Sequence, residues 1–208
     1  MNEGREGRSP DSAQSRNPKS IRKRIVVLTA PSGGGKTTIA RHVMDAVPDL
    51  RFSVSATTRS PRPREREGVD YYFVDRERFE QYVDNGDLLE FEEVYPGLFY
   101  GTLRREVERK ALEGPVLLDV DVRGAEAIKG LYAEDALVIF IRPPTFDTLE
   151  ARLRNRETED ATTLNTRLAR AREELEHAER FDAVVINADV DEAVSETLRL
   201  IRQFLKDE

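Results

Sequence analysis

The sequence predicts an α/β fold in which a parallel β-sheet is covered by helices on both faces. Four short apolar runs, at 25–29, 115–122, 135–144 and 182–187, lack polar alternation and are therefore typical of strands buried on both faces. Helical patterns separate these runs, and such strand-helix-strand repetition places parallel strands in one sheet. Hydrophobic residues make up 38% of the 208 residues, which is enough for one core.

Local signals predict the other elements in order. A helix is expected from about 37 to 47, because Pro48 cannot continue it. Residues 51–102 hold short β-like runs around one helical segment at 77–84, which predicts a small inserted α+β lobe. A further helix is expected from about 103 to 112. The last helix is amphipathic, and its apolar face is formed by Val194, Leu198, Ile201 and Leu205.

Composition narrows the class of protein. The chain has no cysteine, which excludes a disulfide framework and a thiolate metal site. A net charge of −7 disfavours broad nucleic-acid binding, and no apolar run approaches the roughly 20 residues that span a bilayer. Residues 1–21 lack the apolar core of a signal peptide and are predicted to form a disordered tail. By elimination, we expect a cytoplasmic protein with no nucleic-acid, membrane or obligate protein partner.

A glycine-rich loop follows the first predicted strand. Residues 30–37 read APSGGGKT, which fits the phosphate-binding pattern G-x-x-x-x-G-K-[ST] except that Ala30 replaces the first glycine. Glycines allow a tight loop with inward-pointing amides, and the next helix N-terminus favours an anion. Lys36 would reach the β- and γ-phosphates of a nucleoside triphosphate, and Thr37 would place its hydroxyl on Mg²⁺. An ordinary glycine-rich turn is the alternative.

Two carboxylates end the second apolar run. Asp119 and Asp121 lie two residues apart, and on a strand such positions share one face. A carboxylate at the end of a strand that runs parallel to the loop strand suits Mg²⁺ held through water, and we assign this role to Asp119. The alternative is a pair of turn formers in which an aspartate caps the next helix.

Two arginine-rich stretches, at 57–67 and 152–160, read on their own as solvated surface of mixed charge. The helical pattern after the second stretch contains Glu173, Glu174 and Glu176 among arginines, which favours surface ion pairs over metal ligands. Neither stretch indicates a binding site by itself.

The order of the motifs gives a more specific interpretation. The chain carries, in sequence, APSGGGKTT, SVSATTRSPRPRE, DYYFV, LLEF with YGT, LDVDVRGA, RLRNRETE and VINAD. From about Ile25 to its end, the chain resembles the guanylate kinase family, because these later motifs are far more specific than the loop alone. The resemblance implies a P-loop NTPase-type core at 22–50 and 103–208, a GMP-binding lobe at 51–102 and a lid at about 152–166.

The resemblance implies the reaction ATP + GMP ⇌ ADP + GDP with Mg²⁺, and dGMP as a further acceptor. Catalytic roles would fall to Lys36, Arg152, Arg156 and Arg167. The ATP site would comprise Ala30, Pro31, Ser32, Gly33, Gly34, Gly35, Lys36, Thr37, Thr38 and Asn187. The GMP site would comprise Ser55, Arg59, Arg62, Tyr71, Glu90, Tyr100, Thr102 and Asp121. Thr37 and, through water, Asp119 would hold the metal.

The residue types suit this chemistry. Arginine presents a planar fork of donors to phosphate, as Arg59 and Arg62 would. Glu90 could accept from the N1–H and the 2-amino group of guanine, whereas adenine lacks this donor pair and would leave a buried carboxylate unpaired. Phosphoryl transfer needs positioning and charge neutralisation rather than a general base, so lid arginines would neutralise the transferred group and exclude water.

Two other interpretations remain open. One is a non-catalytic interaction module with a guanylate-kinase-like fold, and the other is a kinase of ribosyl bisphosphates on the same fold. The intact GGGKT loop, both aspartates and the lid arginines favour the enzyme over the module. The presence of Glu90, Thr102 and Asp121 favours a guanine nucleotide as acceptor.

The chain departs from the family pattern in the lid and beside the acceptor site. Arg123 stands where the family usually has glutamine, which adds a charge near the acceptor. Asn155 and Glu157 flank Arg156 where the family commonly has glycines. Because residues with a Cβ restrict the backbone more than glycine does, we expect a stiffer lid or an altered rate of closing.

Overall fold

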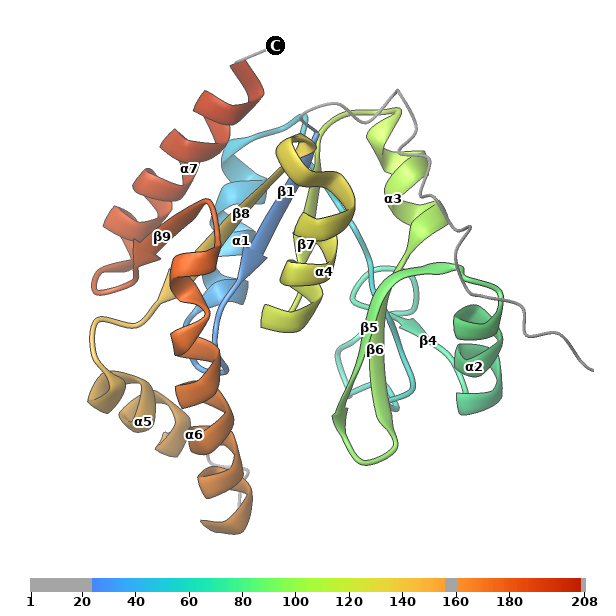
Figure 1. The fold of residues 1–208 in the computed structure, drawn as a ribbon, viewed down its shortest axis with the longest axis horizontal. Helices are drawn as coiled ribbons and strands as arrows, with labels where there is room; N and C mark the ends of the chain where they lie inside the picture. Colours follow the sequence, from blue (N-terminus) through green and yellow to red (C-terminus); the bar gives the residue numbers. More distant parts are fainter. Residues whose placement is uncertain (1–23, 156–160, 207–208) are drawn as a thin grey trace, which may run out of the picture.

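Five parallel strands form the main sheet. The computed structural model describes residues 24–155 and 161–206. The sheet has the order β2-β7-β1-β8-β9, and each neighbouring pair is parallel. Its strands are β2 (Arg51–Phe52), β7 (Val116–Asp119), β1 (Ile25–Thr29), β8 (Ala136–Arg142) and β9 (Ala183–Ile186). Helices lie on both faces of this sheet (Figure 1), so the predicted fold class is confirmed.

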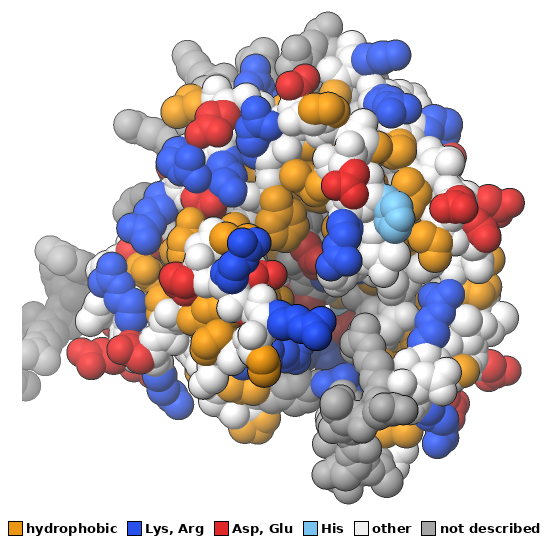
Figure 2. All heavy atoms as spheres, turned by 180° about the vertical axis from the view of Figure 1, so that it is seen from behind, with side chains coloured by type: hydrophobic (Ala, Val, Ile, Leu, Met, Phe, Trp, Pro, Cys, Tyr) orange, Lys and Arg blue, Asp and Glu red, His pale blue; other side chains and the backbone are white. Residues whose placement is uncertain are grey.

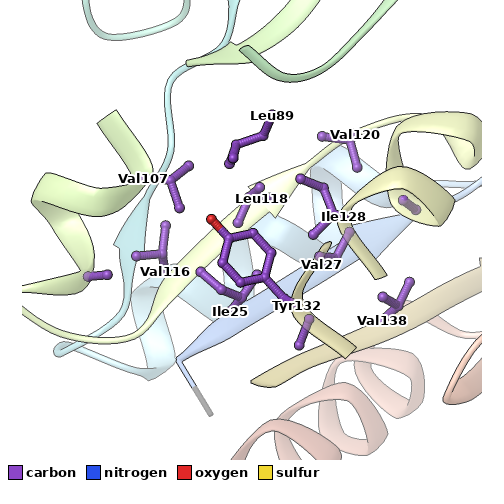
Figure 3. Packing of buried hydrophobic residues seen from close by; sticks show 13 residues of the cluster. Ile25, Val27, Leu89, Val107, Val116, Leu118, Val120, Ile128, Tyr132 and Val138 are labelled. Carbon is purple, nitrogen blue, oxygen red and sulfur yellow. The ribbon is translucent and has the colours of Figure 1, made fainter. Parts of the chain in front are cut away.

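Alternation along the strands divides the core between the two faces. Val26 and Leu28 point toward α1 (Lys36–Ala46) and α7 (Val190–Lys206), where the predicted apolar face of α7 packs. Ile25 and Val27 point the other way, toward α3 (Arg104–Ala111) and α4 (Val122–Tyr132). Figure 3 shows this second cluster, in which side chains of β1, β7 and α4 converge. Both faces of the sheet are therefore buried against helices, as the uninterrupted apolar runs predict.

A small lobe, defined here as β3 to β6 with α2, lies beside the main sheet. Its sheet has the order β4-β3-β6-β5. The elements are β3 (Ala56–Thr57), β4 (Tyr72–Phe73), α2 (Arg76–Asp84), β5 (Leu88–Tyr95) and β6 (Leu98–Leu103). Phe79 and Tyr82 of α2 are buried against this sheet. One expectation was wrong in detail: Arg51 and Phe52, assigned to the inserted lobe, instead pair with β7 in the main sheet.

Two helices follow β8 and project away from the main sheet (Figure 1). They are α5 (Phe146–Arg154) and α6 (Ala161–Glu176), which pack together through Leu149, Leu153 and Ala171. Short 3₁₀ helices, η1 (Ala133–Asp135) and η2 (Ala178–Arg180), precede β8 and β9. The predicted lid spans the junction of α5 and α6, and its residues Arg156 and Glu157 lie outside the described residues, as does the predicted tail at 1–21. Over the parts that are described, none of the helices combines the length and the apolar character needed to cross a membrane.

Candidate functional site: a cavity at the strand ends

A cavity of about 360 Å³ lies at the carboxyl ends of β1 and β7, the end of a parallel sheet where ligands usually bind. Figure 2 shows a hollow in the face opposite to that of Figure 1, with acidic side chains in its depth and Lys and Arg side chains around it. The structure brings together, as lining residues, the predicted Ser32, Lys36, Thr37, Ser55, Arg62, Tyr71, Glu90, Tyr100, Asp119, Asp121 and Arg167. Segments far apart in the sequence therefore meet at one site.

The glycine loop has the backbone that its sequence predicts. Gly33 and Gly35 have φ angles of +86° and +95°, which L side chains rarely adopt. Gly34 N donates to Pro31 O at 2.9 Å, which closes the loop before α1 begins. The methyl group of Ala30 would lie 2.9 Å from a Cβ at Gly34. Alanine at position 30 is thus accommodated because position 34 remains a glycine.

Asn187 supports the loop from beneath. This residue follows β9 and is only 2% exposed, and its Nδ2 donates to Gly34 O at 2.8 Å. Arg152, near the end of α5, donates through Nη2 to Asn187 O at 3.0 Å. Arg152 Nη1 is buried and has no hydrogen-bond partner among the described residues. The nucleotide-binding role of Asn187 stays a prediction, and its contact with the loop carbonyl is the interaction observed.

Gly35→Ala is expected to disrupt this support. An added Cβ would lie 2.2 Å from Asn187 Nδ2 at a φ of +95°, so the Asn187–Gly34 bond and the loop cannot both persist. We expect unfolding free energy to fall by about 2–4 kcal/mol and ATP binding to weaken by at least about tenfold, measured by denaturant unfolding and calorimetry. Gly130→Ala in α4 is the matched control, because no atom lies within 4 Å of its added Cβ. Equal behaviour of the two variants would refute the expectation.

Lys36 spans from the loop to the end of β7. Its Nζ lies 2.6 Å from Asp119 Oδ1 and donates to Val120 O at 2.5 Å. Thr37 follows in the first turn of α1 and is exposed to the cavity. The ammonium group, the Thr37 hydroxyl and the Asp119 carboxylate therefore line the same cavity, next to helix amides that attract an anion.

Asp121 does not lie on the strand, and the reasoning that placed it there was wrong. The strand β7 ends at Asp119, and Asp121 is the N-cap residue of α4. Its Oδ1 accepts from Gly124 N at 2.8 Å, which satisfies a backbone donor of the first helical turn. Helix capping, the alternative interpretation, therefore applies to Asp121, although the residue still lines the cavity.

Glu90 is held at the back of the cavity. Thr102, itself 1% exposed, donates its hydroxyl to Glu90 Oε1 at 2.5 Å. A Cβ on Gly124 would lie 2.6 Å from Glu90 Oε2, so only glycine leaves room for the carboxylate there. Burial raises the pKa of Glu90 to about 7, while the bond from Thr102 opposes the shift. The result is a half-buried acceptor whose charge changes near neutral pH.

Three of the predicted phosphate-binding side chains, Arg59, Tyr71 and Tyr100, form a connected group. Arg59 donates through Nη1 and Nη2 to the two oxygens of Glu65, both at 2.8 Å, and through Nε to Tyr100 Oη at 3.1 Å. Its guanidinium also lies over the ring of Tyr71, 5.3 Å from the centroid. Burial raises the pKa of Tyr71 to about 12, so its hydroxyl is protonated and can donate. Glu65 thus occupies the fork of Arg59, while the guanidinium of Arg62 lines the cavity directly.

Sequence reasoning missed a half-buried ionic group at the edge of the cavity. Arg170 and Glu174 of α6 form an ion pair of 2.7 Å, and Arg170 also reaches Glu92 of β5 and Asp121. Glu174 was predicted to make a surface ion pair, but its side chain is only 11% exposed. Burial raises the pKa of Glu92, and the nearby charge of Asp121 raises it further. No local pattern could reveal this group, because its members come from separate elements.

Fold and site together define the class of protein. A parallel sheet whose first strand leads through a glycine loop into a helix, with Lys-Thr at the helix start and an aspartate at the end of the adjacent strand, is a P-loop nucleotide-binding domain. Across the cavity, the small lobe contributes Tyr71 and Tyr100, and Arg62 lines the same cavity; side chains of these types can donate hydrogen bonds to an anion.

Comparison with known proteins identifies the family. The guanylate kinase family model matches residues 22–204, and the chain belongs to this family. It is 58% identical to a guanylate kinase of Salinibacter ruber over 88% of this chain and 97% of that one. It is 45% identical to a guanylate kinase of Chlorobium luteolum over 88% and 92% of the two chains. The crystal structure of guanylate kinase from Anaplasma phagocytophilum superposes with a TM-score of 0.70 at 34% identity, covering 86% of this chain and 84% of that one.

Proposed function

We propose that the cavity brings ATP and GMP together for direct phosphoryl transfer. As an enzyme of the guanylate kinase family, the chain phosphorylates GMP to GDP with ATP. One observation carries the assignment of the site: the loop lysine Lys36, the strand-end Asp119 and the half-buried Glu90 all line a single cavity. A donor phosphate and an acceptor nucleotide bound by these groups would meet between them.

The phosphates of ATP would lie on the loop of residues 30–35 and the first turn of α1. The positive φ angles of Gly33 and Gly35 turn the loop around a small central space, and the helix amides Lys36 and Thr37 follow directly. The Lys36 ammonium group would exchange its contact with Asp119 for phosphate oxygens. Thr38 is exposed in the first turn of α1, next to Thr37. Asn187 would act on ATP through the loop it supports.

The phosphate of GMP would bind at the small lobe. Arg62, Ser55 and Tyr71 line the cavity, and Tyr100 lines it beside Arg59. A dianionic phosphate would compete with Glu65 for the guanidinium of Arg59. We propose that Glu65 holds Arg59 in place, since a bidentate pair limits the rotamers available to an arginine.

The guanine base would be read by Glu90, Thr102 and Asp121. Thr102 holds one oxygen of the Glu90 carboxylate, and Glu90 lines the cavity. Two acceptors match the N1–H and 2-amino donors of guanine, and an adenine base would leave them unpaired. Because none of these contacts involves the 2′-hydroxyl of ribose, we propose that dGMP is accepted as well.

The residues present fit a magnesium ion. Among the described residues, no three His, Cys, Asp or Glu side chains gather as an all-protein metal site. Mg²⁺ usually keeps several waters and takes one or two protein oxygens together with substrate phosphates. The Thr37 hydroxyl and the Asp119 carboxylate line one cavity, and the Asp119 side chain keeps 20% exposure, which a contact through water requires. The ion would supply positive charge against the phosphate oxygens.

The transfer itself would need no nucleophilic side chain or general base from the protein. The GMP phosphate oxygen attacks the γ-phosphorus in line, and cationic groups neutralise the equatorial oxygens. Lys36 and Arg167 line the cavity, and Arg152 has a buried donor without a partner among the described residues. We propose that these three residues, with Arg156 of the lid, perform this neutralisation and exclude water.

A coupled assay of ADP formation tests the proposal. ATP and Mg²⁺ are supplied with GMP, dGMP, AMP, UMP or no acceptor, and we expect ADP only with the two guanine nucleotides. ADP formation without an acceptor would indicate an ATPase, and equal rates with AMP would contradict guanine reading. Folded chain that binds GMP but forms no ADP would instead favour an interaction module. For the working enzyme we propose small-molecule partners only, in the cytoplasm where nucleotide pools supply both substrates.

A further inference from the structure

One arginine outside the predicted site joins three parts of the molecule. Arg170 lies on α6, and its Nε donates to Glu174 Oε1 on the same helix at 2.7 Å. Its Nη2 donates to Glu92 Oε1 of β5 at 2.9 Å and to Asp121 Oδ2 at the start of α4 at 3.1 Å. Its Nη1 lies 3.4 Å from Val94 O. The guanidinium therefore links α6 to the small lobe and to the N-terminus of α4 at once.

The charges in this group are shielded from water. The side chain of Arg170 is 30% exposed, that of Glu92 is 13% and that of Asp121 is 24%. At such burial a missing partner leaves a poorly solvated charge, and solvent screens the pair much less than at a free surface. One guanidinium contacts three carboxyl groups here and therefore restrains the orientation of each.

Asp121 is fixed at both of its oxygens. Oδ1 accepts from Gly124 N as the helix cap, and Oδ2 accepts from Arg170. With the cap alone, the carboxylate could still rotate about its bond to the side chain, because a single hydrogen bond does not set the plane of the group. Arg170 sets that plane and also holds Glu92, which lies two residues after Glu90 on the cavity-facing side of β5.

We propose that Arg170 is a positioning residue for acceptor specificity: it orients Asp121 toward the guanine base and holds β5 against α6. This inference rests on the proposed GMP site and names a residue that the predicted site does not include. Arg167 lies three residues earlier on the same helix and lines the cavity. The contacts of Arg170 would therefore hold Asp121 and β5, which carries Glu90, in a fixed position relative to α6, the helix that carries Arg167.

The test compares GMP with IMP, which lacks the 2-amino group of guanine. In Arg170→Ala we expect the ratio of kcat/KM for GMP to that for IMP to fall about tenfold, and KM for ATP to change less than about twofold. A purely structural defect would lower both acceptors together and leave the ratio unchanged. Arg199→Ala in α7 is the matched control, since this arginine is 58% exposed and pairs with Glu196 away from the cavity.

A second variant keeps the test decisive if Arg170→Ala does not fold. Arg170→Lys retains the positive charge, but one ammonium group cannot form the fork that reaches Glu174 and Asp121 together. We expect its GMP/IMP ratio to fall at least about threefold, with a thermal midpoint near that of the unaltered chain. A GMP/IMP ratio that stays at the unaltered value in Arg170→Lys would overturn the inference. Failure of the unaltered chain to phosphorylate GMP would be a separate result, against the proposed function itself.

Discussion

Lys36→Ala is expected to lower kcat for GDP formation by at least about 10³-fold, or roughly 4 kcal/mol of transition-state stabilisation. The Lys36 ammonium group lines the cavity at the end of the glycine loop and is partly exposed, so phosphate oxygens can reach it. Its loss removes a fixed positive charge at the point where charge shifts during transfer. Steady-state assays with GMP measure the effect, and circular dichroism establishes that the variant is folded.

We expect the Lys36→Ala variant to fold, because the Lys36 side chain lines the cavity and does not pack in the hydrophobic core. Its partner Asp119 keeps 20% side-chain exposure, so water can solvate this carboxylate when the lysine is removed. Arg41→Ala is the matched control, since Arg41 is exposed on the same helix and does not line the cavity. We expect that control to retain activity within about twofold. Full activity in Lys36→Ala would mean that the loop does not bind the transferred phosphate.

Glu90→Gln is expected to lower kcat/KM for GMP by roughly 10²-fold or more and to leave ATP binding nearly unchanged. The amide keeps one acceptor for Thr102 or guanine but presents an NH₂ group where guanine also presents a donor. Two opposed donors in a buried site remain unsatisfied, and each costs about 1–3 kcal/mol. Calorimetry with ATP and kinetics with GMP separate the two substrates. Equal losses for ATP and GMP would refute a role in reading guanine.

The pH dependence of the same residue gives an independent expectation. The pKa of Glu90 is raised by burial to about 7, so the carboxylate that we propose accepts from guanine is present above that pH and is lost as the pH falls through it. We expect KM for GMP to rise up to about tenfold per pH unit below 7. The phosphate of GMP also protonates near pH 6, but Glu90→Gln shares that effect and lacks the carboxylate. The difference between the two pH profiles therefore isolates Glu90, and identical profiles would contradict the assignment.

Much of the molecule was predictable because its signals are local. A buried strand needs an uninterrupted apolar run, and a phosphate loop needs glycines where backbone φ is positive, as at Gly33 and Gly35. The strand β1 and the helices α1 and α2 accordingly lie within a residue or so of their predicted limits. Each family motif is likewise a short stretch of sequence, so the motifs and their order predicted the family. The comparisons confirm this prediction. Residue roles in the two nucleotide sites stay predictions.

Other features depended on the path of the chain in space. Arg51 and Phe52 joined the main sheet because an open edge of β7 lay beside them, which no pattern within residues 51–102 records. Asp121 became a helix cap because β7 ended at Asp119, three residues before the end of the apolar run at 115–122.

The sequence by itself determined the class of fold, the family and the presence of a phosphate loop, since each is indicated by short motifs or apolar runs whose residues are close together in the chain. Only the tertiary structure decided that Asn187 supports Gly34 and that Arg170 joins Glu92 to Asp121. The physical reason is the same for both contacts. A hydrogen bond or ion pair acts over a few ångströms in space, whereas these partners lie 153 and 78 residues apart along the chain for Asn187–Gly34 and Arg170–Glu92.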